Sequence, residues 1–239
     1  MCGRYVRRSD KQKIAAWFKV KNETANLPMP DADYNIAPTT HQPIIRQSKE
    51  TNEREMVLAR WGLVPFFTNE LSEIKGLSTI NARAETIATS KSWREPMKKR
   101  RCIIPASAFY EWPKEGKPPK QPYAFEICTG NLFAFAGLWD AWKDKDGHWL
   151  QSFAIVTTEA NELMSRIHPR MPVILHAQDY DRWLDREETE RLPLDLLRPL
   201  ESEELEMYEA NPKVGNVRNN GPDLLEKAAK AAKSGLLPL

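Results

Sequence analysis

The sequence contains few cysteines and no long apolar run. Only three of its 239 residues are cysteine. They are odd in number and widely separated, so we expect no disulfide framework and a reducing compartment. The four histidines do not combine with these cysteines at zinc-ligand spacing, so we expect no metal and no other cofactor. No apolar stretch is long enough to span a bilayer, and the N-terminus lacks the apolar core of a signal peptide. We therefore expect a cytoplasmic protein that does not contact a membrane.

The chain also lacks an excess of charge of one sign. It has 35 basic and 33 acidic residues, a net charge of +2. This balance neither requires nor excludes a nucleic-acid partner, so any basic surface must be local. The hydrophobic fraction of 41% and the charged fraction of 28% are typical of soluble globular proteins, and the length suits one larger domain or two small ones.

Hydrophobic patterns indicate one α+β domain with helices around a sheet, and no internal repeat is present. A helix is expected over residues 9–18, opened by a Ser9 cap, with Ile14, Trp17 and Phe18 on one face. We expect further helices over residues 85–99, 161–167, 177–185 and 194–200, and strands over residues 43–47, 55–61, 101–105, 122–128, 131–142, 148–157 and 205–208. Proline should stop the strand at 105.

The segment of residues 113–120, rich in Pro and Gly, predicts a surface hairpin rather than a domain boundary, because strand-like segments flank it closely. We divide the chain into a domain of residues 1–221 and a C-terminal helix and tail of residues 222–239.

The most informative residue is Cys2, directly behind Met1. If Met1 is removed, Cys2 carries a free α-amine and a thiol on adjacent carbons, with ordinary pKa values of about 8 and about 8.5. The amine can form a Schiff base with an aldehyde. The thiol can then close a five-membered thiazolidine ring, with the advantage of an intramolecular step. The alternative is an ordinary second residue on a frayed terminus.

Three further segments contain residues suited to chemistry, each with a structural alternative. In residues 79–86 a loop enters the predicted helix, which suits an anion near Asn81 and Arg83; alternatively Asn81 caps the helix and Arg83 pairs with Glu85 or with solvent. Glu111 lies between aromatic residues that would desolvate it and raise its pKa; alternatively strand alternation turns it toward water. His168, between a predicted helix end and a strand, titrates near neutrality, but a lone histidine is usually structural.

Aromatic residues offer a binding surface. Phe66 and Phe67 follow a proline-bounded turn after Trp61, and two adjacent phenylalanines on a loop do not easily both enter a core. Exposed rings near basic residues suit stacking on bases of single-stranded nucleic acid. The alternative is that one packs inside and the other covers a hydrophobic edge.

Taken together, these segments resemble the SOS-response-associated peptidase family, whose members shield abasic sites in DNA by covalent crosslinking. The resemblance covers nearly all of the chain up to about residue 221. Its matching segments lie in family order at residues 1–4, 34–38, 61–65, 80–86, 101–105, 109–112, 153–157, 168–172 and 214–217.

The resemblance implies a single domain with a twisted, barrel-like mixed β-sheet flanked by helices, and a positively charged cleft. It implies that Cys2 forms a thiazolidine with the ring-opened aldehyde of an abasic deoxyribose. Glu111 is the implied acid/base, and His168 assists ring opening and Schiff-base chemistry. Asn81 would hold Cys2 or the sugar. The implied DNA contacts are Arg4, Pro38, Trp61, Phe66, Phe67, Arg83 and Lys91.

In these implied contacts, Arg4 and Arg83 grip phosphates, Phe66 and Phe67 form a wedge beside the DNA, and Lys91 stands where a relative can carry Arg. The implied partner is single-stranded DNA or a template-primer junction that contains an abasic site, bound by a monomer. The family is also linked to removal of its own Met1 and to lyase activity at abasic sites.

Two other functions are compatible with the same residues. Glutamine amidotransferases also begin Met-Cys-Gly, so an N-terminal-nucleophile amidohydrolase is one alternative, although no further glutaminase signature follows. The other is a non-catalytic reader of modified or single-stranded DNA, in which Cys2 is incidental.

Overall fold

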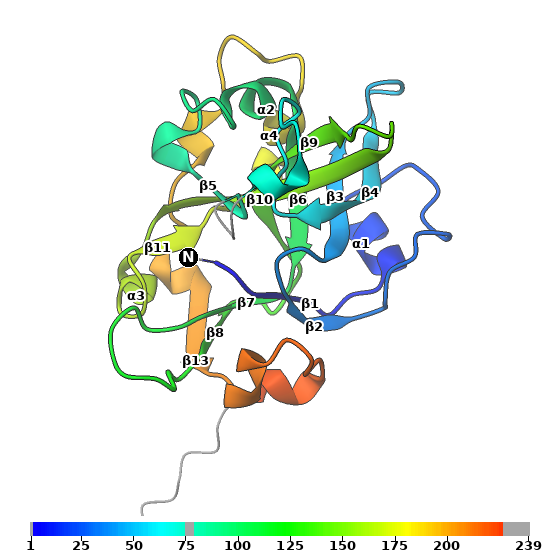
Figure 1. Cartoon of the computed structure of the whole chain (residues 1–239). Helices are drawn as coiled ribbons and strands as arrows, with labels where there is room; N and C mark the ends of the chain where they lie inside the picture. The colour runs from blue at the N-terminus through cyan, green and yellow to red at the C-terminus, as the bar shows by residue number, and fades with distance from the viewer. Residues whose placement is uncertain (1, 75–78, 227–239) are drawn as a thin grey trace, which may run out of the picture.

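The structure is a computed structural model that describes residues 2–74 and 79–226 (Figure 1). Its strands form two sheets. The smaller sheet has five strands in the order β13 (Leu205–Glu209), β8 (Tyr123–Ile127), β7 (Ala108–Glu111), β1 (Tyr5–Arg7) and β2 (Asp33–Ile36). The larger has the order β11 (Arg170–Pro172), β10 (Trp149–Glu159), β4 (Arg54–Trp61), β3 (His41–Gln47), β6 (Arg101–Ala106), β9 (Phe133–Lys143) and β12 (Ile174–Leu175), with β5 (Asn81–Arg83) paired to β10.

The larger sheet closes on itself. Strand β10 pairs with β4 on one edge and with β9 on the other, so β10, β4, β3, β6 and β9 form a five-stranded barrel. The barrel is mixed, because β4 runs parallel to β10 while the other neighbouring strands are antiparallel. The implied single α+β domain with a barrel-like mixed sheet is confirmed. Closure pairs the backbone groups that an open sheet would leave at its edges.

The two faces of these strands bury separate apolar clusters. Helices α1 (Lys11–Trp17), α2 (Arg94–Lys99) and α4 (Tyr180–Leu184) contribute Ile14, Met97 and Trp183 to the first cluster. The five-stranded sheet contributes Tyr5 and Phe109 to the second, which also holds Cys2. The N-terminal segment is therefore part of the core.

Close packing inside the barrel depends on Gly137 of β9. A Cβ atom built at this position would overlap Ile104 Cδ1 and lie 3.0 Å from Cys102 Sγ. Only glycine allows β6 and β10 to approach β9 this closely here.

The helices predicted over residues 9–18 and 85–99 are both shorter in the structure. The predicted helix over residues 9–18 is shorter, and its cap is Asp10 rather than Ser9, because Asp10 Oδ1 accepts a hydrogen bond from the Lys13 amide at 2.7 Å. Trp17 is 44% exposed rather than buried beside Ile14. The helix predicted over residues 85–99 is confined to α2; a three-residue 3-10 helix, Ala84–Thr86, and turns precede it. Thr89 in this stretch donates from Oγ1 to Thr86 O, a local bond of the kind that favours turns, and Thr and Ser residues generally favour turns over helix interiors.

The predicted strands are confirmed, with one difference at Pro105. Strand β6 continues through it to Ala106, and Pro105 lies opposite Ala134 of β9.

The helix predicted over residues 161–167 is the shorter α3 (Glu162–Ser165). That predicted over residues 177–185 begins as a 3-10 helix, Ala177–Asp179, and that over residues 194–200 is the 3-10 helix Leu194–Leu196.

Residues 113–120 form the exposed connection from β7 to β8, as predicted. At the C-terminal end, the described part of the predicted helix and tail contains a 3-10 helix, Pro222–Leu225; residues 227–239 lie outside the described residues. The domain boundary at residue 221 stays a prediction. Within the described residues, every helix is too short or too polar to cross a bilayer.

Candidate functional site

The fold brings the four predicted catalytic residues together from distant parts of the chain. Cys2 precedes β1, which pairs with β7, and Glu111 is the last residue of β7. Asn81 begins β5, and His168 lies just before β11; both of these strands pair with β10. The site therefore lies where the five-stranded sheet meets the barrel.

Asn81 fixes the backbone of Cys2. Its Nδ2 atom donates a hydrogen bond to the Cys2 carbonyl oxygen at 2.9 Å. The Asn81 side chain is 8% exposed, and its buried Oδ1 atom has no hydrogen-bond partner among the described residues. Burying an unpaired acceptor costs free energy, so a group that donates to Oδ1 would be bound favourably here.

Cys2 and Glu111 share a desolvated environment. Cys2 is 1% exposed and Glu111 is 5% exposed. Burial raises the pKa of the Cys2 thiol far above its usual range, and the negative charge of Glu111 raises it further. The thiol is therefore neutral at pH 7 in this structure. The alternative that strand alternation turns Glu111 toward water is wrong, because Glu111 is only 5% exposed.

The His168 ring is held by the backbone of Arg170. Its Nδ1 atom lies 3.0 Å from the Arg170 backbone N–H, from which it can accept, and 3.3 Å from the Arg170 carbonyl oxygen, to which it can donate. Burial lowers the pKa of His168, and the charge of Glu111 opposes this effect. A neutral imidazole donates a hydrogen bond from one ring nitrogen and accepts one at the other, so this ring is suited to proton transfer with a sugar oxygen.

Arg170 connects this site to the segment after β5, and the sequence interpretation gave it no role. Its guanidinium forms an ion pair with Glu85, and its Nη2 atom donates to Thr157 O of β10 at 2.7 Å. Of the two alternatives for Arg83, Glu85 pairs with Arg170 instead, and Arg83 is exposed to solvent. The predicted anion site at a helix N-terminus is wrong, because only a three-residue 3-10 helix follows Arg83. Arg170 could have been noticed because it stands two residues after the predicted site residue His168, but its partner Glu85 lies 85 residues away in the sequence.

The predicted DNA-binding residues fall into exposed and enclosed groups. Phe66 is 55% and Phe67 is 37% exposed. Their rings pack edge to face with centroids 5.4 Å apart. Lys91 Nζ lies 4.4 Å from the Phe67 ring centroid. The alternative that one phenylalanine packs inside is therefore wrong. Arg83 is also exposed, and Pro38 is half-buried.

Trp61 and Arg4 are engaged within the protein. Trp61 is fully buried, and its Nε1 atom donates to Ile80 O at 3.0 Å, so its implied contact with DNA is corrected to a core role. Arg4 Nη1 donates to Asn35 Oδ1 at 2.8 Å and to Val214 O at 2.9 Å. These bonds tie the N-terminal segment to the C-terminal part of the domain. The phosphate contact of Arg4 stays a prediction.

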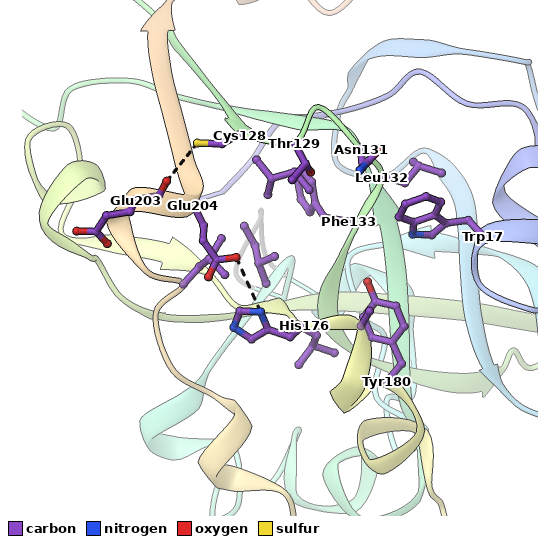
Figure 2. A pocket seen from close by; sticks show the side chains of 15 residues that line it. Trp17, Cys128, Thr129, Asn131, Leu132, Phe133, His176, Tyr180, Glu203 and Glu204 are labelled. Atoms are coloured by element: carbon purple, nitrogen blue, oxygen red, sulfur yellow. Dashed lines mark hydrogen bonds and ion pairs between the residues drawn. The ribbon is translucent and has the colours of Figure 1, made fainter.

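A separate cavity of about 300 Å³ lies elsewhere in the fold (Figure 2). Its walls are largely apolar, and Trp17, Cys128 and Tyr180 are among its lining residues. None of the four predicted catalytic residues lines it. At its rim, His176 Nε2 lies 3.5 Å from a Glu201 oxygen.

Two groups of side chains have spacings compatible with a metal ion. They are His176 with Glu201 and Glu204, and Asp144 with Asp146 and His148. Each group combines one histidine with exposed or half-buried carboxylates, an arrangement that is common on protein surfaces without an ion. Neither includes a residue of the predicted catalytic site.

Known proteins resemble this chain in sequence. Residues 1–217 match the family described as SOS response associated peptidase (SRAP). The abasic site processing protein YoqW of Bacillus subtilis is 36% identical over 231 residues, covering 95% of this chain and 99% of that protein. The abasic site processing protein HMCES of Mus musculus is 30% identical, covering 82% of this chain and 65% of that protein.

Solved structures show the same fold. A crystal structure of a protein from Bacteroides thetaiotaomicron superimposes with a TM-score of 0.84 at 29% identity, covering 95% of this chain and all of that one. A protein from Bordetella bronchiseptica gives a TM-score of 0.73 at 29% identity over 88% of this chain. The family match over residues 1–217, together with these relatives, establishes that the chain belongs to the SRAP family.

Proposed function

We propose that this protein repairs or shields abasic sites in DNA by forming a covalent thiazolidine link through Cys2. The observation that carries the proposal is the placement of Cys2 itself. Its backbone is held by Asn81, and its side chain lies in a desolvated site where the charge of Glu111 acts on both the Cys2 thiol and the His168 ring. Family membership and relatives named abasic site processing proteins support the same substrate.

The first step is capture of the sugar aldehyde. Removal of Met1 gives Cys2 a free α-amine, which attacks C1′ of the ring-opened abasic deoxyribose. A C–N bond forms, and loss of one water leaves an imine. His168 is suited to promote ring opening, because an imidazole ring can donate a hydrogen bond to the ring oxygen as the hemiacetal opens.

The second step closes the ring. The Cys2 sulfur adds to the imine carbon, forming the C–S bond, while the thiol proton moves to the imine nitrogen. Because burial and Glu111 keep the thiol neutral, sulfur attack must be accompanied by proton transfer. Glu111 is the carboxylate suited to relay that proton, so it acts as acid and base in turn. Over the two steps together, one water molecule is released.

The DNA is held by sequence-independent contacts. Exposed Phe66 and Phe67 can stack on bases beside the lesion, and Arg83 and Lys91 can pair with phosphates. We infer that the substrate is single-stranded or a template-primer junction, since an extruded sugar must reach an enclosed site. We also infer that the protein acts as a monomer in the cytoplasm, removes its own Met1, and can act as an abasic-site lyase through the same imine.

The test is intact-mass analysis before and after mixing with abasic single-stranded DNA. We expect a mature mass that begins at Cys2, followed by a heat-stable adduct at the summed mass minus one water. A Cys2→Ala protein that gives the same stable adduct would refute the thiazolidine. Ammonia release from glutamine would instead support an amidohydrolase, and unaltered DNA binding with no adduct would support a non-catalytic reader.

A further inference from the structure

A second basic site lies beside the barrel, away from Cys2. A pocket of about 280 Å³ is lined by the basic residues Arg46, Lys49, Lys99, Arg100 and Arg186 and by the ring of Trp139. We call it the basic pocket. Two carboxylates, Glu50 and Glu55, also line it, so cations outnumber anions on its walls. None of its residues belongs to the proposed catalytic site.

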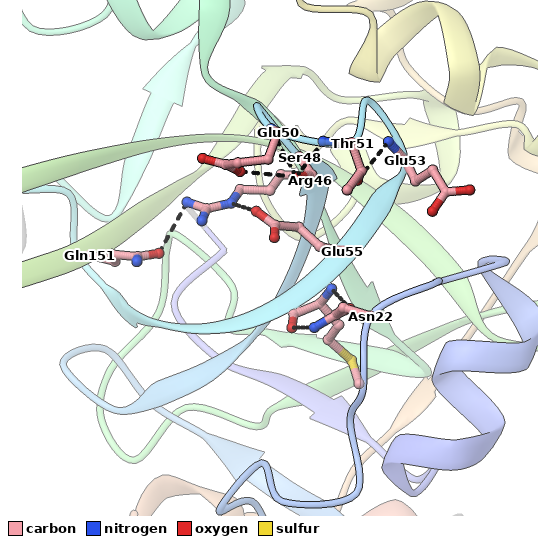
Figure 3. Close-up of polar contacts among 9 residues, drawn as sticks. Asn22, Arg46, Ser48, Glu50, Thr51, Glu53, Glu55 and Gln151 are labelled. Carbon is pink, nitrogen blue, oxygen red and sulfur yellow. Dashed lines mark hydrogen bonds and ion pairs between the residues drawn. The ribbon is translucent and has the colours of Figure 1, made fainter.

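Arg46 is held rigidly at the centre of the basic pocket. Its guanidinium carbon lies 4.0 Å from the Trp139 ring centroid. Nε donates to Glu55 Oε1 at 2.6 Å and Nη1 donates to Gln151 Oε1 at 3.0 Å (Figure 3). These bonds leave Nη2 without a hydrogen-bond partner among the described residues. A fixed guanidinium with a free donor loses little side-chain entropy when it binds an anion.

Three other cations of the pocket are uncompensated. Lys49 and Lys99 are exposed and Arg186 is half-buried. Within residues 2–74 and 79–226, none of these three side chains has a carboxylate within ion-pair distance. Arg46 is neutralised by Glu55, so the excess positive charge of the pocket comes from these three side chains. Such an excess next to a prepositioned guanidinium favours a phosphate group.

Arg100 joins the basic pocket to the exposed phenylalanines. Its guanidinium carbon lies 5.8 Å from the Phe66 ring centroid. It also forms an ion pair at 3.2 Å with the buried Asp140, whose Oδ2 accepts from the Phe66 backbone N–H at 3.1 Å. Arg100 therefore contacts Phe66 of the aromatic pair and also lines the basic pocket.

We propose that the basic pocket binds a backbone phosphate of the DNA strand that stacks on Phe66 and Phe67. This proposal rests on the proposed function, because it takes the strand to pass those rings. Nucleic acid supplies phosphates at regular spacing beyond a stacked base, and contacts of this kind carry no sequence preference. The pocket thus extends the DNA contact beyond the lesion and its immediate neighbours.

The test compares two double variants with matched loss of charge. Lys99→Ala with Arg186→Ala removes two cations of the pocket. Lys13→Ala with Arg198→Ala removes two cations elsewhere on the surface, and neither Lys13 nor Arg198 lines the pocket. Each protein is titrated with undamaged single-stranded DNA of about 20 nucleotides and of about five nucleotides, over a range of salt, and adduct formation is measured separately with abasic DNA.

We expect the pocket variant to bind the long strand about three- to tenfold more weakly than the control variant. The slope of log affinity against log salt should fall by about 0.7 for each phosphate that the variant no longer binds. Affinity for the short strand should not differ between the variants, and the adduct should still form. Failure of the parent protein to form the adduct would instead overturn the proposed function.

Equal long-strand affinity and equal salt slopes for the two variants would overturn the proposal. A pocket variant that loses binding of a free mononucleotide while long-strand binding is unchanged would also overturn it, because the phosphate source would then be a small molecule. Melting temperatures of both variants are measured first, and Lys99→Gln with Arg186→Gln replaces the alanine pair if that pair unfolds.

Discussion

The hydrogen bond from Asn81 to Cys2 gives the sharpest test of how the site is assembled. Asn81→Ala removes the Nδ2 donor that lies 2.9 Å from the Cys2 carbonyl oxygen. Loss of one partner leaves a buried carbonyl unsatisfied, at a cost of about 1–3 kcal/mol. If loss of this bond misplaces the nucleophile and the full cost is added to the activation free energy, crosslinking slows by about 5- to 150-fold.

The assay is the single-turnover rate of adduct formation at saturating abasic DNA, with DNA affinity measured separately. Asn22→Ala is the control, because Asn22 also bonds to backbone groups, at Met56, but lies at the far end of β4 (Figure 3). We expect the control to lower stability without slowing the reaction. An Asn81→Ala rate within about twofold of the parent, smaller than any effect in this range, would refute the view that this bond positions Cys2.

Three further predictions concern binding, pH and packing. Phe66→Ala should weaken single-stranded DNA binding by about 1–3 kcal/mol, measured by fluorescence anisotropy, whereas Trp149→Ala, at a ring that is 66% exposed, should not; equal losses would count against stacking. Burial lowers the pKa of His168, so the unfolded chain binds a proton at this residue more readily than the folded chain does. The contribution of His168 to the free energy of unfolding is therefore fully present above the pKa of the unfolded state. It is lost as the pH falls from that value toward the lower pKa of the folded state. His168→Gln should therefore show a smaller drop in urea midpoint between about pH 7 and about pH 5, and an unchanged drop would contradict this assignment. Gly137→Ala should lower the free energy of unfolding by about 1–3 kcal/mol, because its Cβ would overlap Ile104; a variant as stable as the parent in denaturant titration would disprove the tight contact.

The sequence predicted the strands well because their apolar runs are long and bounded by turn residues. Strand β9 of the barrel was predicted from a run of apolar residues, and it is buried on both faces as expected. The 85–99 helix failed because local side-chain hydrogen bonds competed with helix formation, which apolar spacing does not reveal. Barrel closure followed only from the resemblance, since the parallel pairing of β4 with β10 joins residues about 90 apart in the chain.

The site was predicted by residue type, but its contacts were not. The structure places the predicted residues Cys2, Asn81, Glu111 and His168 together, and their catalytic roles stay predictions. The burial of Glu111 depends on strands that come from other parts of the chain. Trp61 was assigned to DNA because aromatic residues suit both a core and a base stack, and sequence alone cannot separate the two. The Arg170–Glu85 pair was missed because its two residues lie far apart in the sequence.

Strand β10 carries neighbours on both of its edges, first β9 and then β11 on one, first β4 and then β5 on the other. Its central amides should therefore exchange hydrogen with solvent only when the whole domain opens. Asn81 lies in β5 and His168 lies next to β11, so both are positioned by β10, whereas Cys2 and Glu111 are positioned by the five-stranded sheet. Asn81 and His168 should therefore keep their positions until the most protected amides exchange.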